Sequence, residues 1–255
     1  MSSSPTGART GRAGRLLLDY KTHYQVDAEA IVDPEALGPL RHASEHRRLE
    51  TLVRLLRLRE QEKLLDIGCG SGWLAARCRA AGARVWAMDI APAGVAAAQA
   101  RFPEAGYFQV GDGYHLPFAP ESFDVLVLSE VVEHLEDVER TLEEVHRVLR
   151  PGGRVLLSVP YRETIVQHLC IHCNRFTPAH AHLHSFDEEK LGNCLKGRGL
   201  QVQRVVLLTN KLLELAGFPR WSRRWPYQGW RSVDRLFNRL TGKPAFLCML
   251  AAKTG

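Results

Sequence analysis

The sequence that decides the fold is Leu64–Trp73, which reads LLDIGCGSGW. Its first four residues are mostly apolar and predict a short buried strand. The alanine-rich stretch 73–81 then predicts a helix. Between the two lie three glycines at alternate positions, Gly68, Gly70 and Gly72. Such a turn lets a ligand approach the backbone closely, and the helix start offers unpaired N–H groups to an anion.

Glycine-rich turns between a strand and a helix bind two classes of cofactor. Dinucleotide enzymes use the spacing G-x-G-x-x-G, whereas the glycines here follow G-x-G-x-G, two residues after an aspartate. The stretch resembles motif I of the class I S-adenosylmethionine-dependent methyltransferases. This resemblance implies that five residues hold the methionine half of S-adenosylmethionine: Asp66, Gly68, Cys69, Gly70 and Gly72.

Two further carboxylates follow the next predicted strands. Asp89 ends the apolar run 83–90, where a carboxylate can accept both ribose hydroxyls, and Ile90 could lie against the adenine. Asp112 and Gly113 open a stretch that resembles the family's G-D-x-x-x-L-P-F block. There the carboxylate can accept from the adenine amine, and the Gly113 N–H can donate to a ring nitrogen. The alternatives are a helix N-cap at Asp89 and an ordinary turn at Asp112.

The segment after the fourth predicted strand, 122–129, carries the remaining candidates. Open α/β sheets place their chemistry at the carboxyl ends of the strands. The resemblance implies that this segment walls the methyl-transfer site, with Ser129 at the cofactor. His134 is a candidate general base, because imidazole titrates near neutrality. The competing interpretation is structural, since Glu130–His134 also open a helical pattern that continues to Leu149.

A final block, Arg147–Pro160, resembles the family's R-V-L-K-P-G-G turn into a fifth strand, so the resemblance spans Leu64–Pro160. It implies an α/β fold. We expect a Rossmann-like doubly wound sheet of parallel strands, with one antiparallel edge strand and helices on both faces. The expected organisation is a disordered basic tail at 1–15, a helical lid at 16–62, and a methyltransferase domain at 63–255 with inserts at 161–186 and 209–243.

The predicted lid and the last insert offer aromatic side chains to a substrate. Tyr20, Tyr24 and Arg41 are candidate lid contacts, although packing on the sheet would also explain them. The insert 209–243 holds three of the five tryptophans among arginines. It could line a pocket for an aromatic, isoprenoid or glycosyl acceptor, or rest on a membrane surface or a second subunit. It could also simply cover the sheet edge.

The insert 161–186 contains side chains that bind metals in other proteins. Cys170 and Cys173 form a Cys-x-x-Cys pair, and three histidines follow at alternate positions: His180, His182 and His184. One hypothesis is a structural zinc ion, although a second Cys-x-x-Cys is absent. The other is a substrate cover in which His182 and His184 reach the acceptor.

Composition narrows the class of protein. The 255 residues, 45% hydrophobic and 24% charged, are typical of a globular domain with appendages. No apolar run reaches the roughly 18 residues of a transmembrane helix. Six cysteines without a secretory signal predict reduced thiols and a cytoplasmic location. The net charge of +6 lies mainly at the two ends, which we interpret as solvated surface, so nucleic acid is not the expected partner.

These patterns together predict an enzyme that transfers a methyl group from S-adenosylmethionine to a small-molecule acceptor and leaves S-adenosylhomocysteine. A sulfonium methyl group is already activated, so in-line alignment and exclusion of water are the main requirements. Two alternatives are an RNA or protein methyltransferase and a non-catalytic cofactor-binding protein. The glycine spacing disfavours a nicotinamide-dependent oxidoreductase. The sequence leaves open the methylated atom, the oligomeric state and any peripheral membrane contact.

Overall fold

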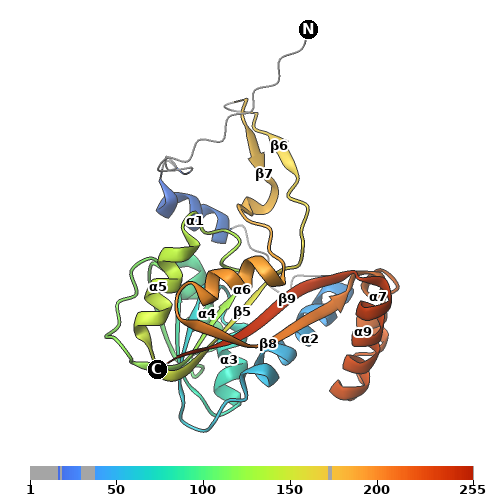
Figure 1. Cartoon of the computed structure of the whole chain (residues 1–255), viewed down its shortest axis with the longest axis horizontal. Coiled ribbons are helices and arrows are strands. Elements are labelled where there is room, and N and C mark those ends of the chain that lie inside the picture. Colours follow the sequence, from blue (N-terminus) through green and yellow to red (C-terminus); the bar gives the residue numbers. More distant parts are fainter. Residues whose placement is uncertain (1–16, 18, 30–37, 172–173, 255) are drawn as a thin grey trace.

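The computed structural model describes residues 17, 19–29, 38–171 and 174–254, so the predicted tail 1–15 and Cys173 lie outside the described residues. A seven-stranded sheet runs through the molecule in the order β3-β2-β1-β4-β5-β9-β8 (Figure 1). Its strands are β1 Lys63–Ile67, β2 Arg84–Asp89, β3 Tyr107–Val110, β4 Phe123–Ser129, β5 Leu149–Pro160, β8 Leu200–Asn210 and β9 Pro244–Lys253. The α-helices are α1 Tyr20–Glu29, α2 Pro39–Leu56, α3 Trp73–Ala80, α4 Pro92–Arg101, α5 Val138–Val148, α6 Glu188–Lys196, α7 Lys211–Leu215, α8 Phe218–Trp221 and α9 Tyr227–Thr241.

The strand pairing confirms the predicted Rossmann-like sheet. Strands β1 to β5 pair in parallel, and the strand order reverses between β1 and β4. Strand β9 runs antiparallel to β5 and to β8, so the antiparallel pair lies at one edge of the sheet. In open α/β sheets a ligand binds at such a reversal, outside the carboxyl ends of the strands.

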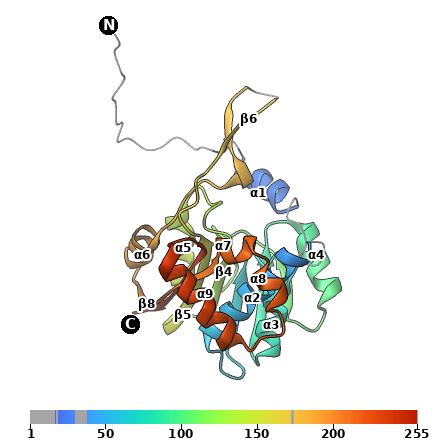
Figure 2. The same cartoon turned by 90° about the vertical axis from the view of Figure 1, so that its right-hand side faces the viewer.

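Helices cover both faces of the sheet (Figure 2). In β4, Val125 and Val127 pack against α2, α3 and the C-terminal helices, whereas Leu126 and Leu128 pack against α5 and α6. All four side chains are fully buried. Because strand side chains alternate between faces, a continuous apolar run such as this one requires cover on both sides.

The insert 209–243 forms α7, α8 and α9, which pack on α2 and β8. Arg47 joins them to α2, because its Nη2 donates to the carbonyl oxygens of Ser222 at 2.9 Å and Trp225 at 2.8 Å. Trp230 is buried beneath this contact. The insert therefore covers the sheet edge, which was the plainest of its predicted roles.

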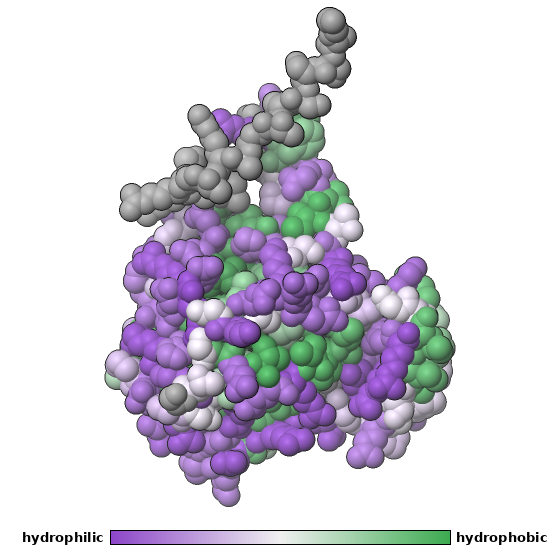
Figure 3. All heavy atoms as spheres, viewed as in Figure 1, coloured by the Kyte–Doolittle hydropathy of each residue, from purple (hydrophilic) through white to green (hydrophobic). Residues whose placement is uncertain are grey.

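The outer side of this insert is partly apolar. Apolar residues gather over the α7 and α9 flank, at the right-hand edge of Figure 3, where Leu215 and Leu240 are exposed. Contact of this flank with a membrane surface or a second subunit stays a prediction. Among the described residues, no helix has the length and apolar character needed to cross a bilayer.

The start of α5, in the segment that follows β4, differs from what simple periodicity predicts. Helix α5 begins only at Val138, where Asp137 accepts the Arg140 N–H at 3.0 Å, so the predicted helix start at Glu130 is wrong. Glu130 has a φ of +58°, which is incompatible with an α-helix.

The insert 161–186 projects as a ribbon of β6 Gln167–Leu169 and β7 Phe176–Pro178 (Figure 1).

Candidate active site

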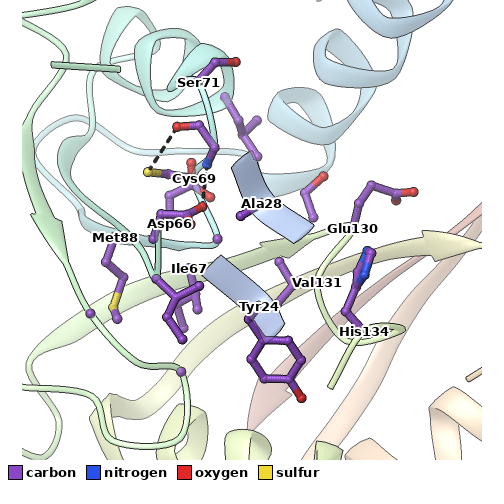
Figure 4. Close-up of a pocket in the computed structure, with 18 of the residues that line it drawn as sticks. Tyr24, Ala28, Asp66, Ile67, Cys69, Ser71, Met88, Glu130, Val131 and His134 are labelled. Carbon is purple, nitrogen blue, oxygen red and sulfur yellow. Dashed lines mark hydrogen bonds between the residues drawn. The ribbon is translucent and has the colours of Figure 1, made fainter. Parts of the chain in front are cut away.

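A cavity of about 360 Å³ lies at the carboxyl ends of β1, β2 and β4, beneath α1 and α2. Figure 4 shows Asp66 and Cys69 on one side of it and Glu130 and His134 on the other. Every predicted cofactor residue except Gly72 borders this cavity: Asp66, Gly68, Cys69, Gly70, Asp89, Ile90, Asp112, Gly113 and Ser129. The structure therefore brings together blocks that are separated in the sequence.

The three glycines of the turn serve different purposes. All have positive φ, +74° at Gly68, +48° at Gly70 and +81° at Gly72, which only glycine adopts at little cost. A β-carbon at Gly68 would lie 2.4 Å from Val131 Cγ2, whereas one at Gly70 would meet nothing within 4 Å. A β-carbon at Gly72 would lie 2.9 Å from the Ala98 side chain. Gly72 thus allows α3 and α4 to pack. It lies outside the cavity lining, and its place beside the cofactor stays a prediction.

Asp89, at the end of β2, accepts a hydrogen bond from the glycine turn that follows β1. Its Oδ2 accepts the Gly70 N–H at 2.9 Å and its Oδ1 accepts the Ala91 N–H at 3.0 Å. A carboxylate has about four acceptor positions, so each oxygen keeps capacity for a ribose hydroxyl. The N-cap residue of α4 is Ala91. The alternative interpretation of Asp89 as the helix N-cap is therefore wrong.

Asp66 is the most deeply buried acid of the glycine turn. Its side chain is inaccessible to solvent, and its Oδ2 has no hydrogen-bond partner among the described residues. Burial, with a contribution from the nearby charge of Asp89, raises the pKa of Asp66 to about 7. A cationic group in the cavity would relieve this cost.

The hydroxyl of the lid residue Tyr20 is engaged with Asp112. Its hydroxyl donates to Asp112 Oδ2 at 2.7 Å, while the Tyr114 N–H donates to Oδ1 at 2.9 Å. Burial opposes ionisation of Asp112, but these hydrogen bonds hold its pKa below the ordinary value. Helix α1 therefore closes over the predicted adenine end, and contact of Tyr20 with an acceptor stays a prediction. Arg41 is exposed and lies outside the cavity lining.

Tyr24 is a wall of the cavity. Its hydroxyl shares a 2.9 Å hydrogen bond with that of Tyr114 and accepts the Glu136 N–H at 2.7 Å. These bonds fix the ring beside Leu135 at the cavity border. Contact between Tyr24 and an acceptor stays a prediction.

Sequence reasoning missed the charged cluster between α2 and the end of β4. Arg48 donates to both carboxylate oxygens of Glu45, at 2.8 and 2.6 Å, and to Ser129 Oγ at 2.7 Å. Glu130 Oε1 lies 3.4 Å from Arg48 Nη1 and accepts from Ser158 Oγ at 3.0 Å. Burial raises the pKa of Glu130 to about 7 despite the attraction of Arg48. The signal was present in α2 as two charged residues on the helix face that also carries its buried leucines.

His134 lies in the cavity wall, with its Nδ1 3.0 Å from Asp27 Oδ2 of α1. A carboxylate at Nδ1 orients an imidazole, in a general base and also in a metal ligand. The His182 ring meets that of His134 edge to face, with centroids 4.7 Å apart. His184 is different, because its Nε2 lies 2.8 Å from the Leu135 carbonyl oxygen, outside the cavity lining. This contact gives His184 a structural role, and its contact with an acceptor stays a prediction.

Known proteins share sequence with the part of the chain that forms much of this cavity. A family model described as "Methyltransferase domain" matches residues 65–157. The methyltransferase GfsG of Streptomyces halstedii is 36% identical over 135 residues, covering 49% of this chain and 47% of GfsG. A ubiquinone biosynthesis O-methyltransferase of Pseudomonas putida is 31% identical over 160 residues, covering 58% of this chain and 68% of that protein. The chain belongs to the S-adenosylmethionine-dependent methyltransferases.

The solved structures agree on the fold of this methyltransferase. A chain from a complex of the Haloferax volcanii Trm112 methyltransferase activator with a methyltransferase matches with a TM-score of 0.66 and 19% identity. The match covers 93% of this chain and 98% of that chain. At this identity the likeness concerns the fold alone. The chain spans about half the length of several curated relatives that it matches, 47%, 43% and 53%.

The residues of this methyltransferase fit S-adenosylmethionine. The buried, unpartnered oxygen of Asp66 suits an ammonium group, and Gly70 leaves open space where a β-carbon would stand. The carboxylates of Asp89 and Asp112 suit hydroxyl and amine donors. A cavity of about 360 Å³ also falls in the range of small-molecule sites, about 300–1,000 Å³.

The burial of Asp66 leads to a prediction about pH. Asp66→Asn is expected to stabilise the cofactor-free protein relative to wild type increasingly as the pH rises from about 4 to about 7. The folded pKa of about 7 exceeds the ordinary value of 3.8, so the folded wild type binds the proton more tightly and loses stability across this window. One pKa unit corresponds to about 1.4 kcal/mol of folding free energy. The buried amide of the new asparagine side chain also lacks a partner and offsets part of the gain, so we expect a net stabilisation of about 2–3 kcal/mol at pH 8. Urea unfolding at pH 4 and pH 8 measures it, and a pH-independent difference would contradict the raised pKa.

Proposed function

We propose that this methyltransferase transfers a methyl group from S-adenosylmethionine to a small-molecule acceptor by direct in-line displacement. The observation that carries the proposal is the convergence of the glycine turn, Asp89 and Asp112 on one cavity at the switch point of the sheet. Such a cavity suits an extended nucleoside ligand, with hydrogen-bonding groups at both ends and apolar surface between.

In this proposal the donor occupies the side of the cavity formed by β1, β2 and the loop after β3. Asp66 and the Gly68–Gly70 backbone hold the methionine part, Asp89 accepts from the ribose hydroxyls, and Asp112 with Gly113 reads the adenine edge. Ile90 and Met88 also border this side and supply apolar contact to the base. Tyr20 fixes the Asp112 carboxylate through its 2.7 Å hydrogen bond.

The acceptor would occupy the opposite side, where Tyr24, Arg48, Glu130 and His134 border the cavity. When bound, S-adenosylmethionine supplies a methyl group that an acceptor lone pair displaces, and the electrons of the broken bond stay on sulfur. The chain then has to orient the acceptor, keep water out and let its proton leave. Helices α1 and α2 serve the first two needs by closing over the cavity. His134, whose Nδ1 lies 3.0 Å from Asp27 Oδ2, borders the cavity and is placed to take a proton.

Two observations support a small molecule over a polymer. The cavity lies beneath α1, whose Tyr20 and Tyr24 are hydrogen-bonded to the wall, so the acceptor has to fit under this cover. The Pseudomonas putida relative is named for ubiquinone biosynthesis, in which the methyl acceptor is a small molecule. The basic termini remain the only feature that favours RNA.

The proposal predicts binding of the spent cofactor and turnover of a small acceptor. Calorimetry should show one S-adenosylhomocysteine bound per chain. Radiolabelled S-adenosylmethionine should then label members of a panel of phenols, carboxylic acids, amines and isoprenoids, but not total RNA or protein extract. Labelling of RNA or protein alone would overturn the small-molecule proposal. Binding without turnover on any acceptor would favour a non-catalytic cofactor-binding protein.

A further inference from the structure

The most unusual side chain outside the proposed cofactor contacts is that of Glu133. It is completely buried, and neither carboxylate oxygen has a hydrogen-bond partner among the described residues. Buried carboxylates are normally paired, hydrogen-bonded or bound to a metal ion. Glu133 lies with His134 and His182, and one ligand atom from each side chain is within 4.8 Å of the other two.

We propose that Glu133, His134 and His182 bind one divalent transition-metal ion, of which Zn²⁺ is the leading candidate, at the wall of the cavity. Two imidazoles and one carboxylate form a ligand set used by catalytic zinc and by other first-row metals, and it leaves further coordination positions open. Mg²⁺ and Ca²⁺ prefer ligand sets made of oxygen atoms. Bonds of about 2.0–2.2 Å to a tetrahedral ion place ligand atoms roughly 3.4 Å apart, so small side-chain movements would close the site.

The backbone already holds the two ligand-bearing segments together. The N–H groups of Leu183 and His184 donate to the Glu133 carbonyl oxygen at 2.7 and 3.1 Å. The His184 side chain adds its 2.8 Å contact with the Leu135 carbonyl oxygen. The loop that follows β7 is thereby fixed against the turn that follows β4. Such prior positioning is what a metal site needs from its scaffold.

Each imidazole also has a carboxylate behind it. Asp27 Oδ2 lies 3.0 Å from Nδ1 of His134, and Glu163 contacts Nδ1 of His182. Metal-bound histidines typically direct their second ring nitrogen to a carboxylate, a carbonyl oxygen or water, which fixes the ring and its tautomer. The hydrogen bond to Glu163 engages Nδ1 of His182 and leaves its Nε2 for the ion. At His134 the Asp27 carboxylate lies within ion-pair distance of Nδ1, but this nitrogen has no hydrogen-bond partner among the described residues. A carboxylate thus lies near Nδ1 of each histidine, and a small rotation of the His134 ring would complete the second hydrogen bond.

This site differs from the zinc hypothesis for the Cys-x-x-Cys pair. Among the described residues of that segment only His182 takes part, and the other two ligands come from the turn that follows β4. His180 is exposed and His184 is used structurally. Cys173 lies outside the described residues.

The position of the ion has a consequence that rests on the proposed function. His134 borders the cavity, so an open coordination position there would face the acceptor. With His134 bound to the ion, the ion replaces it as the group that activates the acceptor: a hydroxyl oxygen bound to Zn²⁺ loses its proton to solvent more easily, because the ion stabilises the oxyanion. The oxyanion then forms the new O–CH₃ bond while the S–CH₃ bond breaks and its electrons stay on sulfur. The acceptor class would thus be a small molecule with a hydroxyl group.

The test uses full-length, tag-free protein stripped with a chelator. Titration with ZnCl₂ should show one ion per chain, and Co²⁺ should give the visible absorption of a low-symmetry site. Glu133→Gln and His182→Gln should weaken Zn²⁺ binding at least tenfold, while His180→Gln, on the same loop, should bind like wild type. Zn²⁺ should also raise the melting temperature of wild type and of His180→Gln, but not that of the two ligand variants.

Several outcomes would overturn the inference. No Co²⁺ absorption and no Zn²⁺ heat with wild type would do so, as would equal binding by wild type and both ligand variants. If one ligand variant does not fold, the other decides. S-adenosylhomocysteine binding is measured on the same stripped samples, so retained cofactor binding without metal binding refutes the ion while leaving the proposed function intact. In that case, loss of activity in His134→Gln alone would identify His134 as a general base.

Discussion

Replacing Asp89 with alanine is expected to weaken binding of S-adenosylhomocysteine by at least about 100-fold. In the proposed donor placement, the substitution removes two charge-assisted hydrogen bonds to the ribose, each worth roughly 1.5–3 kcal/mol, and about 1.4 kcal/mol corresponds to a factor of ten. It also releases the Gly70 N–H, which Asp89 Oδ2 accepts at 2.9 Å, so the glycine turn loses its tie to β2. Isothermal titration calorimetry at a fixed pH measures the effect.

A matched control is Asp124→Ala. Asp124 is also a strand aspartate that accepts a backbone N–H, from Lys63 at 2.7 Å, but it lies at the amino end of β4, away from the cavity. This control should leave cofactor affinity within about twofold of wild type. If Asp89→Ala bound S-adenosylhomocysteine as tightly as the control does, Asp89 would not hold the ribose and the donor placement would need revision.

Replacing Arg48 with methionine is expected to destabilise the protein by about 3–5 kcal/mol, the usual cost of removing one partner from a buried ion pair. Arg48 is almost wholly buried and donates to Glu45 and Ser129 while lying 3.4 Å from Glu130. Without it, two carboxyl groups of the cluster lose their cation. Urea unfolding at pH 7 measures the loss.

The pH dependence and two further variants test the cause. Burial opposes ionisation of Glu45, but Arg48 lowers its pKa below the ordinary 4.5. The stabilisation is therefore present above about pH 4.5 and is lost as the pH falls, so Arg48→Met should approach wild type in acid. Adding Glu45→Gln should recover part of the stability at pH 7. Arg54→Met, which removes an exposed partner of Glu50 on the same helix, should change stability by less than about 0.5 kcal/mol. A large effect of this control would mean that α2 itself, and not the buried charge, is sensitive.

The sequence by itself was sufficient where function depends on residues that are close along the chain. The strand, glycine turn and helix around Gly68–Gly72 follow from backbone freedom and apolar periodicity, both of which are local properties. Asp89 and Asp112 follow strands that had to be parallel neighbours, so their meeting at one cavity could be predicted from topology. The doubly wound sheet was confirmed for the same reason.

Only the tertiary structure decided where side chains from distant segments meet. Nothing local to Arg48 indicates that it binds Ser129, and nothing local to His182 places it beside Glu133, because those contacts depend on how α2 and the loop after β7 pack on the sheet. The hydrogen bond from Tyr20 to Asp112 also depends on this packing. Helix α5 begins only at Val138, because the backbone at Glu130 lies outside the helical region. Periodicity records which face of an element is buried, but it does not record what that face contacts. The residues of the proposed cofactor side could therefore be named from the sequence, whereas those of the proposed acceptor side, such as Arg48 and Glu130, are brought together only by the fold.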